Sequence, residues 1–204
     1  NDNKMKFNAI VGNPPYQIMD GGNSNSSKNV YHHFIEIAKK LNPNLISMIM
    51  PARWYAGGKG LDSFRDEMLN DSRISDIYDF PNSNECFSNV EIAGGVCYIK
   101  WNSNHKNDCK ITNKINGNLN SALRSLSEFD ILIRDNRAVP IIKKVIEINK
   151  KGENLSERVS SRKPFSLPTN YKPIQNGVPC WFIQKIGLKF AKKEDVIDTN
   201  NYLD

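Results

Sequence analysis

Apolar runs of strand length alternate along the chain with segments in which apolar residues recur at helical spacing. The runs cover Phe7–Val11, Leu45–Met50 and Ile74–Phe80, and the helical pattern fills the intervals at Val30–Leu41 and Leu61–Leu69. Strands that alternate with helices are typical of βαβ units, which build a parallel sheet. The first half of the chain therefore predicts an α/β fold.

Further elements follow these units. Gly95–Trp101 predicts a fourth strand, and because it comes so soon after another strand we expect an antiparallel partner at the sheet edge. The Asn- and Lys-rich stretch 102–120 has the pattern of one short strand, and Ala138–Ile148 predicts a third strong helix. Asp20–Asn29, rich in Gly, Ser and Asn, is expected to be a mobile loop. Residues 150–204 show weak periodicity, so no fold is predicted for them.

Charge is distributed unevenly along the sequence. The net charge is +6, yet residues 1–136 hold 15 basic and 15 acidic side chains, whereas residues 137–204 hold 13 and 7. A basic segment of this kind fits binding to a polyanion such as nucleic acid, but a solvated lysine-rich surface would have the same composition. Charge supports a nucleic-acid partner without establishing one.

The remaining bulk features narrow the class of protein. No run of about 18 apolar residues occurs, and no apolar signal sequence follows the polar N-terminus, so we expect a soluble cytoplasmic protein without a membrane partner. The four cysteines lack the CxxC spacing of zinc sites and the three histidines lack the spacing of ligand sets, so we predict no metal. The carboxylates also lack the spaced pattern of a nuclease site.

Chemistry is indicated at Asn13-Pro14-Pro15-Tyr16, which follows the first predicted strand. An amino group on a base is a poor nucleophile because its lone pair is delocalised, so a site that activates it must accept both N–H bonds. The Asn13 carboxamide and the Pro14 backbone carbonyl are suitable acceptors, and two prolines hold them in place. Tyr16 offers an aromatic face to a base removed from its stack. The alternative is a rigid turn that merely ends the strand.

The stretch VGNPPYQ resembles motif IV of the amino-methyltransferases, in the form typical of enzymes that modify adenine N6. Met48–Trp54, with Gly60-Leu61 and Phe64-Arg65 after it, is similar to the strand and loop that follow motif IV in restriction-modification methylases of the Eco57I type. Glu85–Phe87 with Gly94–Tyr98 resembles motif VIII of those enzymes, which implies that Phe87 packs on the other face of a flipped adenine. A buried position for Phe87 in the core of the hairpin is an alternative of equal weight.

The resemblance also implies a domain arrangement. Lys163–Asn170 looks like the opening of the target-recognition region of this family, where the positive charge lies. We therefore expect a partial methyltransferase domain at residues 1–135, a connecting helix at 136–150 and the beginning of a DNA target-recognition region at 151–204. The DNA-binding candidates from this comparison are Arg53, Lys59, Arg65, Arg162 and Lys163, and ordinary surface charge is the alternative for each.

The chain departs from the family in one respect. The resemblance implies S-adenosyl-L-methionine as cofactor, but the Gly-rich motif that binds it lies upstream of motif IV, and this sequence begins with Asn1. Gly57–Gly60 lacks the GxGxxG form and is interpreted as a loop hinge. We expect the second half of a Rossmann-like methyltransferase sheet in which Asn13 touches the cofactor, the other contacts lie upstream, and this fragment alone is inactive.

Three other interpretations remain. Enzymes that methylate a glutamine amide in proteins, and some RNA methyltransferases, use the same Asn-Pro-Pro-Tyr motif, and a DNA-specificity module could keep it as a dead remnant. Pro179-Cys180 invites comparison with cytosine-C5 methyltransferases, but it lacks a clear strand end before it. The favoured hypothesis is a DNA adenine-N6 methyltransferase of a restriction-modification system, with double-stranded DNA and a restriction endonuclease domain or subunit as partners.

Overall fold

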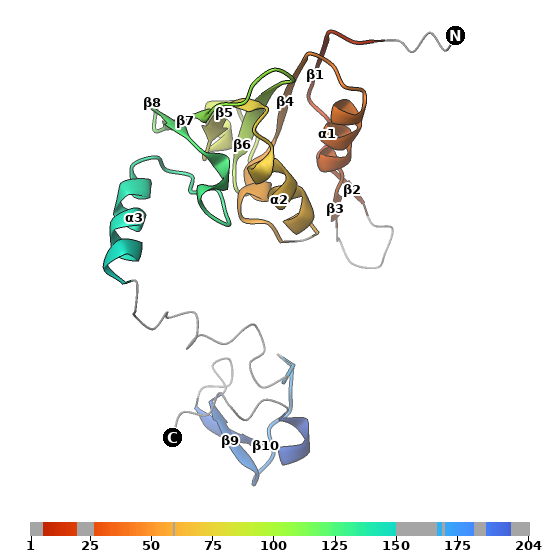
Figure 1. The fold of residues 1–204 in the computed structure, drawn as a ribbon. Coiled ribbons are helices and arrows are strands. Elements are labelled where there is room, and N and C mark those ends of the chain that lie inside the picture. The colour runs from red at the N-terminus through yellow and green to blue at the C-terminus, as the bar shows by residue number, and fades with distance from the viewer. Residues whose placement is uncertain are drawn as a thin grey trace. The chain divides into compact units, whose positions relative to one another are not determined.

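A computed structural model of the chain describes residues 6–19, 27–58, 60–149, 167–168, 170–181 and 187–196. It divides into two compact units, Asn1–Ile146 and Glu147–Asp204, which are described here separately (Figure 1). No helix among the described residues is long and apolar enough to cross a membrane.

The N-terminal unit is built on a six-stranded mixed sheet (Figure 1). Four of its strands are parallel to one another, and two are antiparallel to their neighbours. In spatial order the strands are β1 (Ala9–Gly12), β4 (Leu45–Pro51), β6 (Val96–Asn102), β5 (Ile74–Phe80), β7 (Cys109–Ile115) and β8 (Asn118–Arg124). The predicted α/β class is confirmed, and β1, β4, β5 and β7 end at the same edge of the sheet.

Two predictions about this sheet were wrong in part. The antiparallel strand β6 lies between β4 and β5, not at the edge, because its Val96, Ile99 and Trp101 side chains are fully buried and need neighbours on both sides. The stretch expected to hold one short strand forms the hairpin β7–β8. Its turn, Asn116-Gly117, has positive φ at both residues, as type I′ hairpin turns require.

Two helices supply the other layer of the core. Helix α1 (Tyr31–Lys40) buries Tyr31, Ile35 and Ala38, and α2 (Asp62–Asn70) buries Phe64, Met68 and Leu69. These side chains join alternate residues of β4, β5 and β6 in one apolar cluster. The predicted strands and helices of this part are confirmed to within one or two residues.

Shorter elements complete the N-terminal unit. Strands β2 (Gln17–Met19) and β3 (Ser27–Asn29) pair as an antiparallel ladder. The last three residues of the expected loop Asp20–Asn29 therefore form a strand, and residues 20–26 lie outside the described residues. Helix α3 (Ala138–Ile148) has the bounds that were predicted. The 3-10 turns are η1 (Ala52–Ala56), η2 (Ser83–Glu85) and η3 (Leu126–Glu128).

The described part of the C-terminal unit is a small β structure. Strands β9 (Val178–Trp181) and β10 (Leu188–Ala191) pair antiparallel, and the turn η5 (Lys193–Asp195) follows. Cys180, Ala191 and Val196 form its buried centre. Pro179 and Cys180 therefore belong to a strand of this hairpin.

Candidate active site

The candidate site lies where the parallel strands end. Asn13 follows β1 directly, Arg53 lies on η1 directly after β4, and the segment Glu91–Gly95 leads into the antiparallel strand β6 at the same edge. Ligands of open α/β sheets bind outside the carboxyl ends of the strands. The sheet thus brings the predicted motif together with two segments that are distant in sequence.

The Asn13–Tyr16 segment is held at both ends. The strand pairing of Gly12 with Met48 fixes its beginning, and the Val30 N–H donates a hydrogen bond of 3.1 Å to the Tyr16 carbonyl oxygen. Asn13 is exposed and Pro14 is buried. Within the described part of the chain, no donor reaches the Pro14 carbonyl oxygen. The Asn13 side chain is therefore exposed to a ligand, whereas the Pro14 carbonyl oxygen is an unbonded acceptor of a buried residue.

Tyr16 is half-buried and packs against the core of the N-terminal unit. Burial raises the pKa of its phenol, and the Asn13 side chain acts in the opposite direction. The phenol is therefore neutral near pH 7. It can contribute an aromatic surface and a hydrogen-bonding hydroxyl group, and it has no tendency to act as a phenolate base.

A small pocket of about 210 Å³ opens beside Tyr16. Pockets that hold drug-sized ligands or cofactors occupy about 300–1,000 Å³, so this one suits a group no larger than a single base. The residues that line it come from four segments of the sheet edge: Tyr16, Gln17, Asn29, Pro51, Arg53, Glu91, Ile92 and Ala93.

Phe87 is not among these lining residues. It is half-buried after η2, and its N–H donates to the Ser83 carbonyl oxygen at 2.8 Å. Among the described aromatic rings, none pairs with that of Phe87. The structure does not bring Phe87 against Tyr16, and its stacking role stays a prediction.

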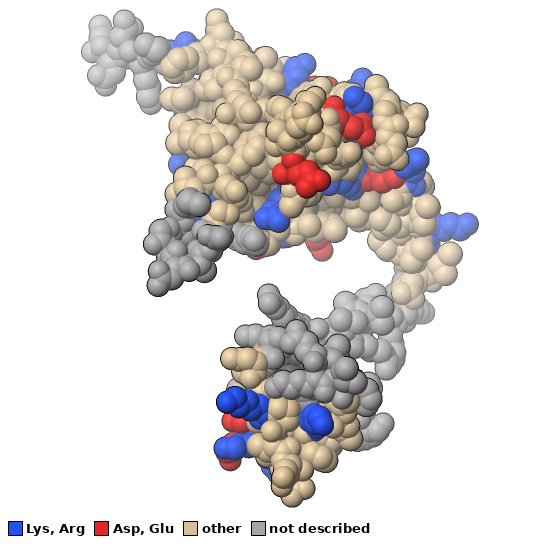
Figure 2. Space-filling model, turned by 180° about the vertical axis from the view of Figure 1, so that it is seen from behind, with Lys and Arg blue, Asp and Glu red and all other residues tan. Residues whose placement is uncertain are grey.

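The predicted basic contacts differ in their surroundings. Arg53 is exposed at the pocket, whereas the Arg65 side chain is only 17% exposed and is paired with Asp62 and Asp66. Lys59, Arg162 and Lys163 lie outside the described residues. On the face of the N-terminal unit in Figure 2, basic and acidic side chains are interspersed, in keeping with the charge balance of residues 1–136.

Gly57 is tightly packed, and the interpretation of Gly57–Gly60 as a loop hinge stays a prediction. Its φ is +72°, and a Cβ there would lie 2.4 Å from an Asp62 oxygen and 2.5 Å from an Arg65 nitrogen. Arg65 also donates to the Ala56 carbonyl oxygen at 3.2 Å. The glycine therefore makes room for packing of η1 on α2. The predicted contact of Asn13 with S-adenosylmethionine stays a prediction.

A group of three metal-ligand types does occur on α1. Potential ligand atoms of His32, His33 and Glu36 lie within 4.8 Å of one another. His33 Nδ1 lies 3.3 Å from Glu36 Oε2 as an i,i+3 pair whose side chains are 60% and 33% exposed, and such pairs form on a helix surface without a metal. Burial lowers the pKa of His32. We assign no metal to this group.

The sequence analysis missed a buried ion pair at the same edge. Asp79, near the end of β5, is 1% exposed, and Arg134 donates to both of its carboxylate oxygens at 2.7 Å. Arg134 also donates to the Gly94 carbonyl oxygen at 2.6 Å. The only signal in the sequence is Asp79 itself, because it shares the core-facing side of β5 with Ile77.

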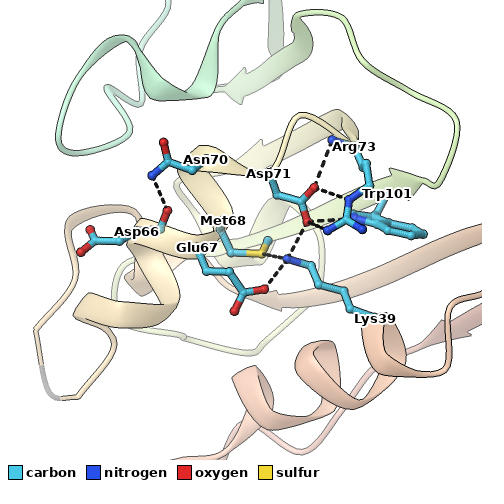
Figure 3. Close-up of polar contacts among 8 residues, drawn as sticks. All are labelled: Lys39, Asp66, Glu67, Met68, Asn70, Asp71, Arg73 and Trp101. Atoms are coloured by element: carbon cyan, nitrogen blue, oxygen red, sulfur yellow. Dashed lines mark hydrogen bonds and ion pairs between the residues drawn. The ribbon is translucent and has the colours of Figure 1, made fainter.

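A second buried aspartate lies at the opposite edge of the sheet (Figure 3). Asp71 accepts hydrogen bonds from Arg73, Lys39 and the Trp101 indole N–H. A larger cavity of about 670 Å³ adjoins it. Its lining contains neither the Asn13–Tyr16 motif nor another open constellation of reactive groups, so this edge is not the candidate site.

Comparison with known proteins agrees with the chemistry at the carboxyl edge. Residues 1–87 match the sequence model of the Eco57I restriction-modification methylase family. The predicted resemblance is confirmed. An adenine-specific methylase of Mycoplasma pneumoniae, itself uncharacterised, is 36% identical over 113 residues, which are 54% of this chain and 27% of that protein.

Solved structures of restriction-modification systems are also similar. A chain of a type I restriction-modification system matches with a TM-score of 0.42 and 13% identity, over 77% of this chain and 34% of that chain. The type I methyltransferase subunit from Streptococcus thermophilus matches with a TM-score of 0.39 and 13% identity, over 76% and 33%. The chain spans about a third or less of the length of these proteins.

Proposed function

We propose that this chain provides the target-base site of an S-adenosylmethionine-dependent DNA adenine-N6 methyltransferase of a restriction-modification system. The main support is the Asn13–Tyr16 segment at the end of β1. Asn13 is exposed, the Pro14 carbonyl oxygen has no donor among the described residues, and Tyr16 lines a base-sized pocket, although Asn13 and Pro14 are not among its lining residues. The match of residues 1–87 to a restriction-modification methylase family agrees with this assignment.

Each residue of the motif has a task in this proposal. Asn13 Oδ1 and the Pro14 carbonyl oxygen accept the two N6 hydrogens of a flipped adenine, which localises the nitrogen lone pair. Tyr16 supports one face of the ring. S-adenosylmethionine, when bound, supplies the electrophilic methyl group. The residues of the motif would hold the base with its amino nitrogen toward that methyl group. The N–CH3 bond would form as the sulfur–CH3 bond breaks, S-adenosylhomocysteine would leave, and the N6 proton would pass to solvent.

Binding of duplex DNA is proposed to rest on phosphate contacts. Arg53 is the described candidate, since it is exposed beside the pocket, and Lys59, Arg162 and Lys163 extend the proposal to residues outside the described ranges. Phosphate contacts provide affinity without sequence information. A restriction endonuclease domain or subunit is a proposed partner, as in the systems to which the family belongs.

The experiment is methyl transfer from labelled S-adenosylmethionine to mixed-sequence DNA, followed by nucleoside analysis. It is run on this chain and on a version extended to the length of its relatives. We expect N6-methyladenine from the extended version. If neither version modifies a DNA base and the extended version instead methylates RNA or a protein glutamine, the substrate assignment is wrong. DNA binding without any transfer would support a dead specificity module.

A further inference from the structure

From the segment between η3 and α3, 55 residues after Asp79 in the sequence, Arg134 reaches the carboxyl end of β5. Its guanidinium makes three hydrogen bonds there, two to the Asp79 carboxylate and one to the Gly94 carbonyl oxygen. It also lies 5.5 Å from the centre of the Tyr55 ring. One side chain thus connects the end of β5, the segment before β6 and the 3-10 turn after β4.

The segment that Arg134 contacts forms one wall of the pocket. Glu91, Ile92 and Ala93 line it together with Tyr16 and Arg53, and Gly94 and Gly95, which do not line it, follow in the sequence. The Gly95 N–H donates to the Ile92 carbonyl oxygen at 2.8 Å, and the Gly95 carbonyl oxygen accepts from the Ala52 N–H at 3.0 Å. The position of the wall therefore depends on the two glycines.

Close packing at Gly95 leaves little freedom. Its φ is +76°, and a Cβ would lie 2.2 Å from the Phe80 carbonyl oxygen, 2.6 Å from that of Pro81 and 2.8 Å from Arg134 Nη2. Only glycine allows the wall to lie this close to the strand end and to Arg134. The arrangement is specific to this guanidinium, since a lysine ammonium cannot form the fork to Asp79 and also reach Gly94 with the same geometry.

The buried carboxylate of Asp79 needs the Arg134 guanidinium as its charged partner. Burial raises the pKa of Asp79, while the bonds from Arg134 act against that rise. Burial alone would lower the pKa of Arg134, but its bonds with Asp79 raise it. Asn113 fixes the same segment from the other side, because its side-chain amide donates to the Arg134 carbonyl oxygen at 2.6 Å.

We propose that Arg134 is a positioning residue that holds the Glu91–Gly95 wall against the strand ends and so sets the width of the pocket for the target group. The proposal rests on the proposed function for its catalytic consequence, but its structural part is independent of that function. Arg134 touches no reacting atom. It acts through the wall, so its loss changes how the base is held and leaves phosphate binding unaffected.

The test uses two variants and one control. Arg134→Lys keeps a positive charge beside Asp79 but loses the fork, and the paired change Asp79→Asn with Arg134→Gln keeps the volume without leaving a buried charge unpaired. Arg137→Gln is the control, because Arg137 lies three residues away, is exposed and bonds only to its neighbour Asp135.

The first measurement is amide hydrogen exchange on the 204-residue chain. In Arg134→Lys and in the paired variant, the amides of Gly95 and Ala52 should exchange about tenfold faster, while those of buried β4 should change by less than about twofold. The control should resemble the unmodified chain. Unchanged exchange at Gly95 and Ala52 in both folded variants would overturn the proposal whatever the activity of the protein.

The second measurement separates positioning from stability. In the extended enzyme, well below the unfolding temperature, we expect kcat for methyl transfer to fall about tenfold in Arg134→Lys, with KM for DNA within about twofold. A fluorescent adenine analogue at the target position should report looser stacking. If kcat per folded molecule were the same in Arg134→Lys and in the unmodified enzyme, Arg134 would have only a structural role and the positioning role would be wrong. Faster exchange without any transfer by the unmodified enzyme would overturn the proposed function only.

Discussion

The amino and carboxyl edges of the sheet each contain a buried aspartate, but they differ in whether their polar groups are hydrogen-bonded within the protein. At the amino edge, Asp71 is satisfied by Arg73, Lys39 and Trp101 (Figure 3). At the carboxyl edge, Asp79 is satisfied by Arg134, whereas the Asn13 side chain is exposed and the Pro14 carbonyl oxygen has no donor among the described residues. Polar groups that are hydrogen-bonded within the protein (closed groups) stabilise a fold, whereas fixed polar groups without such a bond (open groups) are available for chemistry. Changes at the two edges should therefore have separable effects.

The largest expected effect is on stability, at the closed edge. Asp71→Ala should lower the free energy of unfolding by about 3–5 kcal/mol, because it leaves the Lys39 and Trp101 groups buried without their partner. Urea unfolding followed by circular dichroism measures this. Asp76→Ala is the matched control, since its side chain is 37% exposed and its Lys100 partner lies 3.6 Å away. A loss no larger than in the control would contradict a structural role for this cluster.

At the open edge the expected effect falls on activity instead. Asn13→Ala in the extended enzyme should reduce kcat about 10²–10³-fold, as the loss of one preorganised polar contact to the reacting group does in other enzymes. DNA affinity should change by less than about threefold, since phosphate contacts dominate it. Asn104→Ala, an exposed asparagine after β6, serves as control. Parallel loss of transfer and DNA binding would contradict this division of tasks.

The acid sensitivity of folding should originate at the closed edge. Burial alone would raise the pKa of Asp71, but hydrogen bonds from Arg73 and Lys39 outweigh it and hold that pKa well below its usual range. The stabilisation is fully present above the unfolded pKa of about 3.9 and is lost as pH falls below it. Unfolding by urea at pH 7, 5 and 3 tests this. Asp71→Asn should show a smaller drop between pH 5 and 3, with the remainder due to groups such as Glu128, whose pKa is also lowered.

Sequence and structure agree best where a local pattern determines the element. The helix Ala138–Ile148 and the strand Leu45–Pro51 follow from apolar spacing alone, and the proline pair after β1 locates the motif at a strand end. The β7–β8 hairpin could also have been predicted, since Asn116-Gly117 is a strong turn signal. The strand pair β2–β3 could not, because each strand is only three residues long and Ser27–Asn29 is polar, so neither shows a strand pattern of usual length.

The candidate site was predictable only in its local part. Asn13 to Tyr16 are contiguous, so their residue types and their place after a strand indicate their chemistry. The wall at Glu91–Gly95 and its link to Arg134 depend on β6 lying between β4 and β5, which apolar content alone did not reveal. Arg65 is the opposite case. The sequence indicated that its charge could bind DNA, but in the fold its guanidinium is paired with two aspartates.

The smallest expected effect concerns the two arginines near the site. Arg53→Gln should weaken DNA binding and reduce the slope of log affinity against log salt by about one unit, because one exposed phosphate contact is lost. Arg65→Gln should leave that slope unchanged, since its guanidinium is paired with Asp62 and Asp66 and bonded to the Ala56 carbonyl oxygen. Titration of labelled duplex at several salt concentrations distinguishes the two. Equal changes in slope would mean that Arg65 exchanges its aspartate partners for phosphate when DNA binds, and the contrast between open and closed groups would then not extend to α2.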